Sequence, residues 1–329
     1  MNSTGEHNVW KFDQLAPFVI FSSIHSFSLV FNAFFFLVIK QFGDRKTTPI
    51  VFIYNMILSN VMNIIGTYIG FLLPLVWTDE FYFGKQFRQN YSAFLTLFIA
   101  FSYRHQLFLS FLMIIQRFYC VLNPTTQTFT DYYLWLYSGL LMAFGALLLL
   151  IPFLSDCYMY TDQRRLKILS ACEPNVHPIA KYHIKFTAYA PYISLIFTIA
   201  LIFYVSAKHG KTFKNSQTSN SRILKKIRNY EKNMLIQAVS TTIFLTVYDF
   251  GGRISRFISP AFVVLTSTDI FYIFYIRAAF ATLITFTVYG IATRRTRNLI
   301  ITSLFWLIRG DNGKQISVVS TQIRRTSHL

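Results

Sequence analysis

Residues 91–121 read YSAFLTLFIAFSYRHQLFLSFLMIIQRFYCV. Apolar and aromatic side chains dominate this stretch, and its charged residues are Arg104 and Arg117, thirteen positions apart. A helix needs about 20 mostly apolar residues to cross the hydrocarbon core of a bilayer. The stretch is therefore long enough and apolar enough to span a membrane as a single helix.

Similar runs occur on both sides of this one along the chain. The whole set predicts an all-α membrane protein, a seven-transmembrane helix bundle. The run near 233–257 fits least well, because charged residues and a glycine pair interrupt its outer half, so a six-span interpretation stays open. The other predicted spans lie near 16–40, 50–76, 132–154, 184–206 and 260–291.

The composition supports a membrane protein over a soluble one. Hydrophobic residues make up 53% of the chain and charged residues only 13%, about half the usual share for a soluble domain. A net charge of +18 is also typical of nucleic-acid-binding proteins, but here the basic residues lie between apolar runs and form no single basic surface. We therefore expect no nucleic-acid partner.

The basic residues also predict the direction of the spans. On the seven-span map, the loops on the side of the carboxyl terminus hold 19 lysines and arginines, and those on the other side hold 10. Because basic residues favour the cytoplasmic side, we expect residues 1–15 outside the cell, a bundle at 16–291 and a cytoplasmic segment at 292–329. Asn2 begins a glycosylation triplet on the predicted outside.

The cytoplasmic segment is expected to begin with a short amphipathic eighth helix. Arg297 and Arg309 flank a stretch with positive charge, and the apolar residues of this stretch include Leu299, Ile300, Ile301, Leu304, Phe305 and Leu307. Such a helix lies on the inner leaflet, and basic residues near it attract anionic lipids. The remaining tail is basic and rich in serine and threonine.

Residues 116–124, QRFYCVLNP, form a motif at the predicted cytoplasmic end of the third span. The motif resembles the Asp/Glu-Arg-Tyr motif of rhodopsin-like G-protein-coupled receptors, with glutamine in place of the acid. The seventh span, ending at TFTVYG (285–290), resembles the Asn-Pro-x-x-Tyr motif of that family at Tyr289. Asn32 and Asn60 resemble the polar positions that the family has in the first and second spans.

The chain departs from the family in ways that are typical of a divergent branch. The third span has no cysteine at its outer end, which leaves Cys157 and Cys172, both in the second outer loop, as a candidate disulfide. The seventh span has no lysine for retinal, and the third has no aspartate for an amine ligand. With its loosened motifs and spans rich in Phe and Tyr, the chain resembles the nematode serpentine chemoreceptors.

The resemblance implies a chemosensory receptor in the cell membrane that binds a small-molecule ligand and a heterotrimeric G protein. Arg117 would pair with Glu231 at the inner end of the sixth span at rest, and Tyr289 would take part in the switch. Activation would break the pair and open the cytoplasmic ends of spans 3, 5, 6 and 7. A simpler interpretation is that Arg117 snorkels to lipid headgroups.

Charged residues inside spans mark the candidate ligand site, because a charge in the bilayer core is costly. Arg104, Asp249 and Arg277 fall in the outer half of three different spans, and His105 and Tyr275 lie near them in the sequence. One interpretation is structural, with Asp249 paired to one of the two arginines. The other is that a surplus arginine faces a cavity and recognises an acidic or strongly polar ligand.

Other classes of membrane protein fit the sequence less well. A metal hydrolase needs several converging ligands, and His25 and His105 are the only span histidines. We therefore expect no enzyme activity, no metal and no cofactor. A small-molecule transporter or channel is the main alternative, although the chain shows no internal repeat of the kind that transporters often have.

Overall fold

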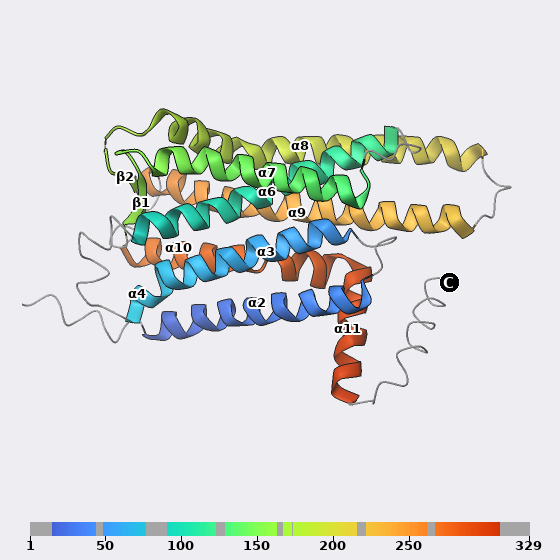
Figure 1. Cartoon of the computed structure of the whole chain (residues 1–329), viewed down its shortest axis with the longest axis horizontal. Helices are drawn as coiled ribbons and strands as arrows, with labels where there is room; N and C mark the ends of the chain where they lie inside the picture. The colour runs from blue at the N-terminus through green and yellow to red at the C-terminus, as the bar shows by residue number, and fades with distance from the viewer. Residues whose placement is uncertain are drawn as a thin grey trace, which may run out of the picture.

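Long helices running side by side form one bundle in the computed structural model (Figure 1). The structure describes residues 15–43, 49–76, 91–122, 129–162, 167–172, 174–215, 222–261 and 267–309. The helices are α2 (Leu15–Phe42), α3 (Ile50–Thr67), η1 (Tyr68–Leu72), α4 (Leu73–Val76), α6 (Ala93–Leu122), α7 (Asp131–Phe153), α8 (Pro178–Asn215), α9 (Arg222–Ala261), α10 (Ser267–Thr282), η3 (Phe286–Ala292) and α11 (Arg294–Arg309).

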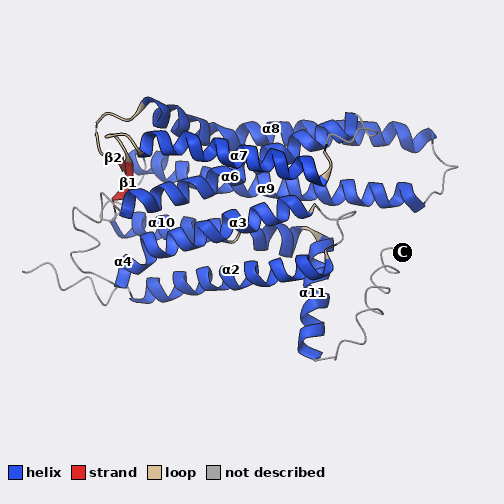
Figure 2. Cartoon of the chain, viewed as in Figure 1, coloured by secondary structure: helices blue, strands red, loops and turns tan. Residues whose placement is uncertain are grey.

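The described residues contain six helices that are long and apolar enough to cross a membrane, and seven spans if the bent pair α10 and η3 counts as one. The fold is thus the predicted membrane-spanning helical bundle. In the described part of the chain, the strands form one hairpin, β1 (Met159–Asp162) and β2 (Lys167–Ser170), at one end of the bundle (Figure 2).

The irregular span is the seventh and not the sixth. The sequence places an interruption at 249–253, yet α9 runs through these residues to Ala261 without a break. Arg253 there donates to Asp249 one turn earlier, at 3.0 Å, and to the carbonyl of Ala188 on α8, so the charges are satisfied within the helix pair. The bend lies between α10 and η3, where the axis turns by 57°.

The bend in the seventh span exposes a backbone carbonyl that neighbouring spans satisfy. Ser28 on α2 donates to the carbonyl of Thr282 at 2.5 Å, and Asn60 on α3 donates to the same oxygen at 2.8 Å. Asn60 also donates to the hydroxyl of Thr285 at 3.0 Å. In lipid no water is available for a freed carbonyl, so these two side chains stabilise the bent conformation.

Helices α3 and α6 form the centre of the bundle. In the apolar segments of the spans that contain α3 and α6, 61% and 67% of the residues are buried, whereas the share in α7 is 22%. Large apolar side chains on α7 point away from the protein, among them Leu136, Leu140 and Leu147. Such faces are stable only against lipid, which agrees with α7 lying at the periphery.

Helix α11 runs across the long axis of the bundle at the end opposite the hairpin (Figure 1). Thr296 anchors its first turn by donating to the carbonyl of Tyr289 at 2.5 Å. Leu304, Phe305 and Leu307 are exposed. A helix occupies the segment where the sequence predicts one, and its position on the inner leaflet stays a prediction. Asn2 and the tail beyond residue 309 lie outside the described residues.

The two donors to Thr282 generate the first prediction. Replacing both in Ser28→Ala/Asn60→Ala leaves a buried carbonyl without a partner, so the double variant should lose more unfolding free energy than the two single variants together. Hydrogen bonds between spans are worth up to about 1.7 kcal/mol, and we expect a total loss of about 2 kcal/mol. Unfolding of the purified chain in mixed detergent measures it.

The matched control is Ser23→Ala. Ser23 lies on the same helix but is exposed and donates to its own helix, at the carbonyl of Val19. This variant should unfold like the parent. Equal losses in Ser23→Ala and the double variant would show that the bonds to Thr282 do not stabilise the bend.

Candidate functional site

A cavity of about 580 Å³ opens in the hairpin half of the bundle. Its walls come from α6, α7, α8, α9 and α10, and the hairpin contributes Met159, Thr161 and Ile168. The volume lies within the range of small-molecule pockets, roughly 300–1,000 Å³. The apolar part of the wall includes Leu97, Leu149 and Phe153.

The hairpin is held to the first turn of α6 by hydrogen bonds. The Ser92 hydroxyl donates to the carbonyl of Thr161 at 2.7 Å and accepts from the Thr161 amide at 3.1 Å. The hydroxyls of Thr96 and Thr161 lie 2.7 Å apart. These contacts fix β1 over the cavity, whose wall includes Thr161.

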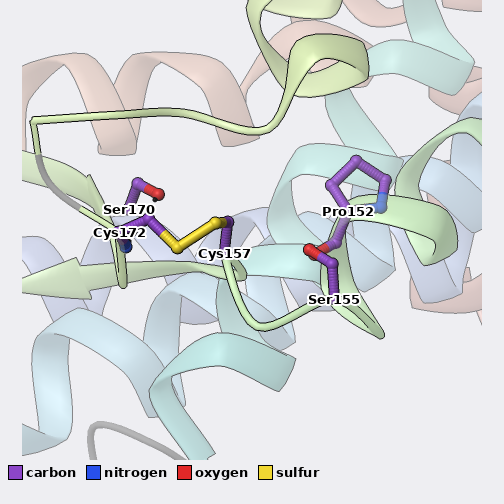
Figure 3. Close-up of a disulfide and its surroundings, with 5 residues drawn as sticks. All are labelled: Pro152, Ser155, Cys157, Ser170 and Cys172. Carbon is purple, nitrogen blue, oxygen red and sulfur yellow. Dashed lines mark hydrogen bonds between the residues drawn. A yellow bond between two sulfur atoms is a disulfide. The ribbon is translucent and has the colours of Figure 1, made fainter.

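A disulfide closes the hairpin upon itself. It joins Cys157, just before β1, to Cys172, just after β2, with their Cα atoms 4.9 Å apart (Figure 3). The Cys172 amide donates to the Ser170 hydroxyl at 3.2 Å on the same side of the hairpin. Together with the four paired positions of the strands, the bridge holds β1 and β2 against each other beside the cavity.

Three of the charged residues that the sequence singles out line this cavity: Arg104 on α6, Asp249 on α9 and Arg277 on α10. Among the described residues Asp249 pairs with Arg253, at 3.0 Å, and no salt bridge joins it to Arg104 or Arg277. Arg253 is four residues further along α9, and residues at that spacing lie on the same helix face.

The other two arginines have no carboxylate partner among the described residues. Arg104 is only 7% exposed, and its Nη1 atom has no hydrogen-bond partner in the described part of the chain. The guanidinium of Arg277 lies over the ring of Tyr248, 5.0 Å from its centre, and its Nε atom is likewise unpartnered there. Tyr103 packs against Tyr248 with ring centres 5.3 Å apart.

The two remaining candidate ligand residues point elsewhere. His105 is buried and lies 3.4 Å from the Asn55 side-chain oxygen, on the side of α6 that faces α3. Tyr275 donates to the carbonyl of Phe71 at 2.9 Å and stacks on Phe21. Both side chains therefore contribute to contacts between helices and do not line the cavity.

The candidate ligand residues left out several residues of the cavity wall, among them Arg253, Tyr103 and Tyr248. The spacing of Arg253 from Asp249 is a recognisable signal of a helical ion pair. Tyr103 and Tyr248 directly precede Arg104 and Asp249 in the sequence. Only the fold shows that their two rings contact each other at the cavity wall.

The residues expected to form a switch lie in the other half of the bundle. Arg117 is 3% exposed near the end of α6, and Tyr289 on η3 is fully buried with its ring 5.4 Å from that of Phe35. Glu231 belongs to α9, but its side chain lies outside the described side chains. The structure thus places two of the three residues inside the protein.

Two comparisons connect this architecture with known proteins. Residues 47–199 match the family model of the Caenorhabditis serpentine receptor-like proteins, class xa. Serpentine receptor class XA 10 from Caenorhabditis elegans is 26% identical over 286 residues, which cover 82% of this chain and 85% of the relative.

The bundle and these matches identify a class: a multi-pass membrane protein similar to the serpentine receptors. Within that class, the chain resembles the nematode receptors of class xa.

The ion pair in the cavity wall generates the second prediction. Asp249→Asn removes the carboxylate and leaves Arg253 partly buried without a counter-charge, so it should destabilise the protein. Asp249→Asn/Arg253→Gln removes both charges and should be less destabilised than the sum of the single variants, by about 1 kcal/mol. Thermal unfolding of the purified chain in detergent measures this coupling.

The control cycle combines Asp249→Asn with Arg294→Gln, because Arg294 is exposed and lies near the far end of the bundle. These two changes should be additive. Additivity in the Asp249 and Arg253 cycle as well would show that the pair does not stabilise the wall.

Proposed function

We propose that the protein is a chemosensory G-protein-coupled receptor that binds a small ligand in the cavity of about 580 Å³. Binding changes the packing of the helices around the cavity. The cytoplasmic ends of α6, α8, α9 and the seventh span then contact a heterotrimeric G protein. In this orientation the amino terminus is outside and the carboxyl terminus is in the cytoplasm.

The observation that carries the proposal is the burial of Arg117 at the opposite end of α6 from the cavity. An arginine that snorkelled to lipid headgroups would have an exposed side chain in the protein alone, whereas Arg117 is 3% exposed. It lies thirteen residues from Arg104, about 20 Å along the helix. One helix therefore carries two buried arginines, Arg104 at the proposed ligand cavity and Arg117 near its last turn.

The proposed switch follows from the cost of burying a charge. A buried guanidinium requires compensation by polar or charged neighbours, and a carboxylate that approaches it strengthens the resting packing. We assign that carboxylate to Glu231, since α9 packs beside α6. Separation of α6 and α9 on activation would break the pair and open the inner end of the bundle.

Anionic lipids of the inner leaflet are the third proposed partner. Helix α11 places Arg294 and Arg297 beside exposed apolar side chains at the cytoplasmic end of the proposed orientation. Each basic residue near an anionic surface contributes about 1 kcal/mol of attraction. This attraction would hold α11 against the leaflet and so support the inner ends of α2 and η3, on which α11 packs.

The third prediction tests the switch. Glu231→Gln removes the proposed partner of Arg117 and should raise ligand-independent signalling several-fold in cells that express a promiscuous G protein. The readout is G-protein dissociation at equal surface expression. The control is Lys232→Gln, because Lys232 is the next residue on α9 and is exposed.

Unchanged basal signalling in Glu231→Gln would rule out Glu231 as the partner of Arg117. Transport is tested separately, by uptake of radiolabelled solutes into the same cells. Uptake that persists without the G protein, in cells that give no G-protein signal, would identify a transporter and contradict the receptor function.

A further inference from the structure

The cavity wall has an excess of unpartnered hydrogen-bond donors. Its described side chains include three arginines and one carboxylate, Asp249. That carboxylate already accepts a hydrogen bond from Arg253. Arg104 and Arg277 therefore remain without a counter-charge in the described part of the chain, and the cavity carries an excess positive charge.

The excess donors come from α6 and α10, and all of their residues line the same cavity. The Nη1 atom of Arg104, the Nε atom of Arg277 and the hydroxyl of Tyr103 are all buried and lack a hydrogen-bond partner among the described residues. Tyr248 connects two of these residues, because its ring contacts both Tyr103 and the Arg277 guanidinium, and Arg104 directly follows Tyr103 on α6. A ligand that supplies several acceptor oxygens and a negative charge would satisfy all three.

The rest of the wall is apolar and sets the second requirement. Leu97, Leu148, Leu149 and Ile184 surround the same space. Burying a fully polar anion against such side chains would leave its other polar groups without partners. An apolar body of several carbon atoms, in contrast, would be stabilised by about 25 cal/mol for each Å² that it buries.

We propose that the ligand is an amphipathic organic anion, with a carboxylate or another oxyanion head group at Arg104 and Arg277 and an apolar body along α7 and α8. Arginine suits such a head group because its guanidinium can donate two parallel hydrogen bonds to one oxyanion. The assignment deepens the proposed receptor function, on which it rests for the use of this cavity as the ligand site.

The test measures binding of radiolabelled decanoate to the purified full-length chain in nanodiscs of neutral lipid, without any G protein. We expect saturable binding that unlabelled decanoate displaces, and that decan-1-ol and decylamine do not. Displacement by decan-1-ol with equal potency would overturn the proposal, because it would mean that the apolar body alone is recognised. Absence of saturable decanoate binding would also overturn it.

The variants locate the head group. Arg104→Gln and Arg277→Gln should each weaken decanoate binding about tenfold or more, as expected for the loss of a charged hydrogen bond. Arg104→Lys keeps the charge and should retain part of the affinity, which separates charge recognition from a folding defect. The control Lys40→Gln removes an exposed positive charge near the end of α2, outside the cavity lining, and should bind like the parent.

Two further measurements complete the test. The first asks whether the anion is a free molecule or a lipid head group, and the second distinguishes failure of the ligand class from failure of the receptor function. Nanodiscs that contain phosphatidylserine should leave decanoate binding unchanged, whereas competition by that lipid would identify a lipid head group as the anion at the same arginines. Arginine-dependent binding without any G-protein signal in cells would contradict the receptor function alone. A receptor activated by ligands with no preference for an anion would contradict the ligand class alone.

Discussion

The carbonyl of Thr282 is the backbone group on which the arrangement of three spans depends. A bend of 57° in the seventh span frees this oxygen from its helical partner, and Ser28 and Asn60 donate to it from α2 and α3. An unsatisfied carbonyl in hydrocarbon is costly, so the bend is compatible with a membrane only when a neighbouring span donates to this oxygen. The bend also directs η3 inward, which buries Tyr289, and turns the chain into α11.

Charge imposes a comparable constraint in the opposite half of the bundle. The hairpin covers a cavity whose wall contains more positive than negative side chains. The bundle compensates these charges unequally. Arg253 is compensated by a carboxylate, a carbonyl and two tyrosine rings, whereas Arg277 has the ring of Tyr248. A buried guanidinium without a counter-charge is unfavourable in free energy. A bound anion would reduce this cost and a neutral ligand would not, so the proposed site favours the anion.

Sequence reasoning succeeded where a single helix carries the signal and failed where the signal is tertiary. Length and apolarity located the spans, because a lipid environment demands both of each helix separately. The bend at Thr282 has no local cause such as proline, and its partners lie 254 and 222 residues away, so only the fold reveals it. At the candidate site, the cost of a charge in lipid located Arg104, Asp249 and Arg277. His105 and Tyr275 were chosen as neighbours in sequence, but one helical step rotates a side chain by about 100°, which turns them to other faces.

The interior between the two ends of α6 explains how the proposed receptor can move. Ser110 on α6 lies 3.2 Å from the Thr242 hydroxyl on α9 and 3.3 Å from that of Ser194 on α8. These hydroxyls hold three helices together midway between Arg104 and Arg117. Hydrogen bonds of this kind contribute roughly 0.6 kcal/mol each in a membrane, and a hydroxyl can rotate to a new acceptor when a helix shifts. A core locked by charged pairs here would resist such a shift. The small hydroxyl groups therefore permit α9 to move against α6 and α8, which is the motion that the proposed switch at Arg117 requires.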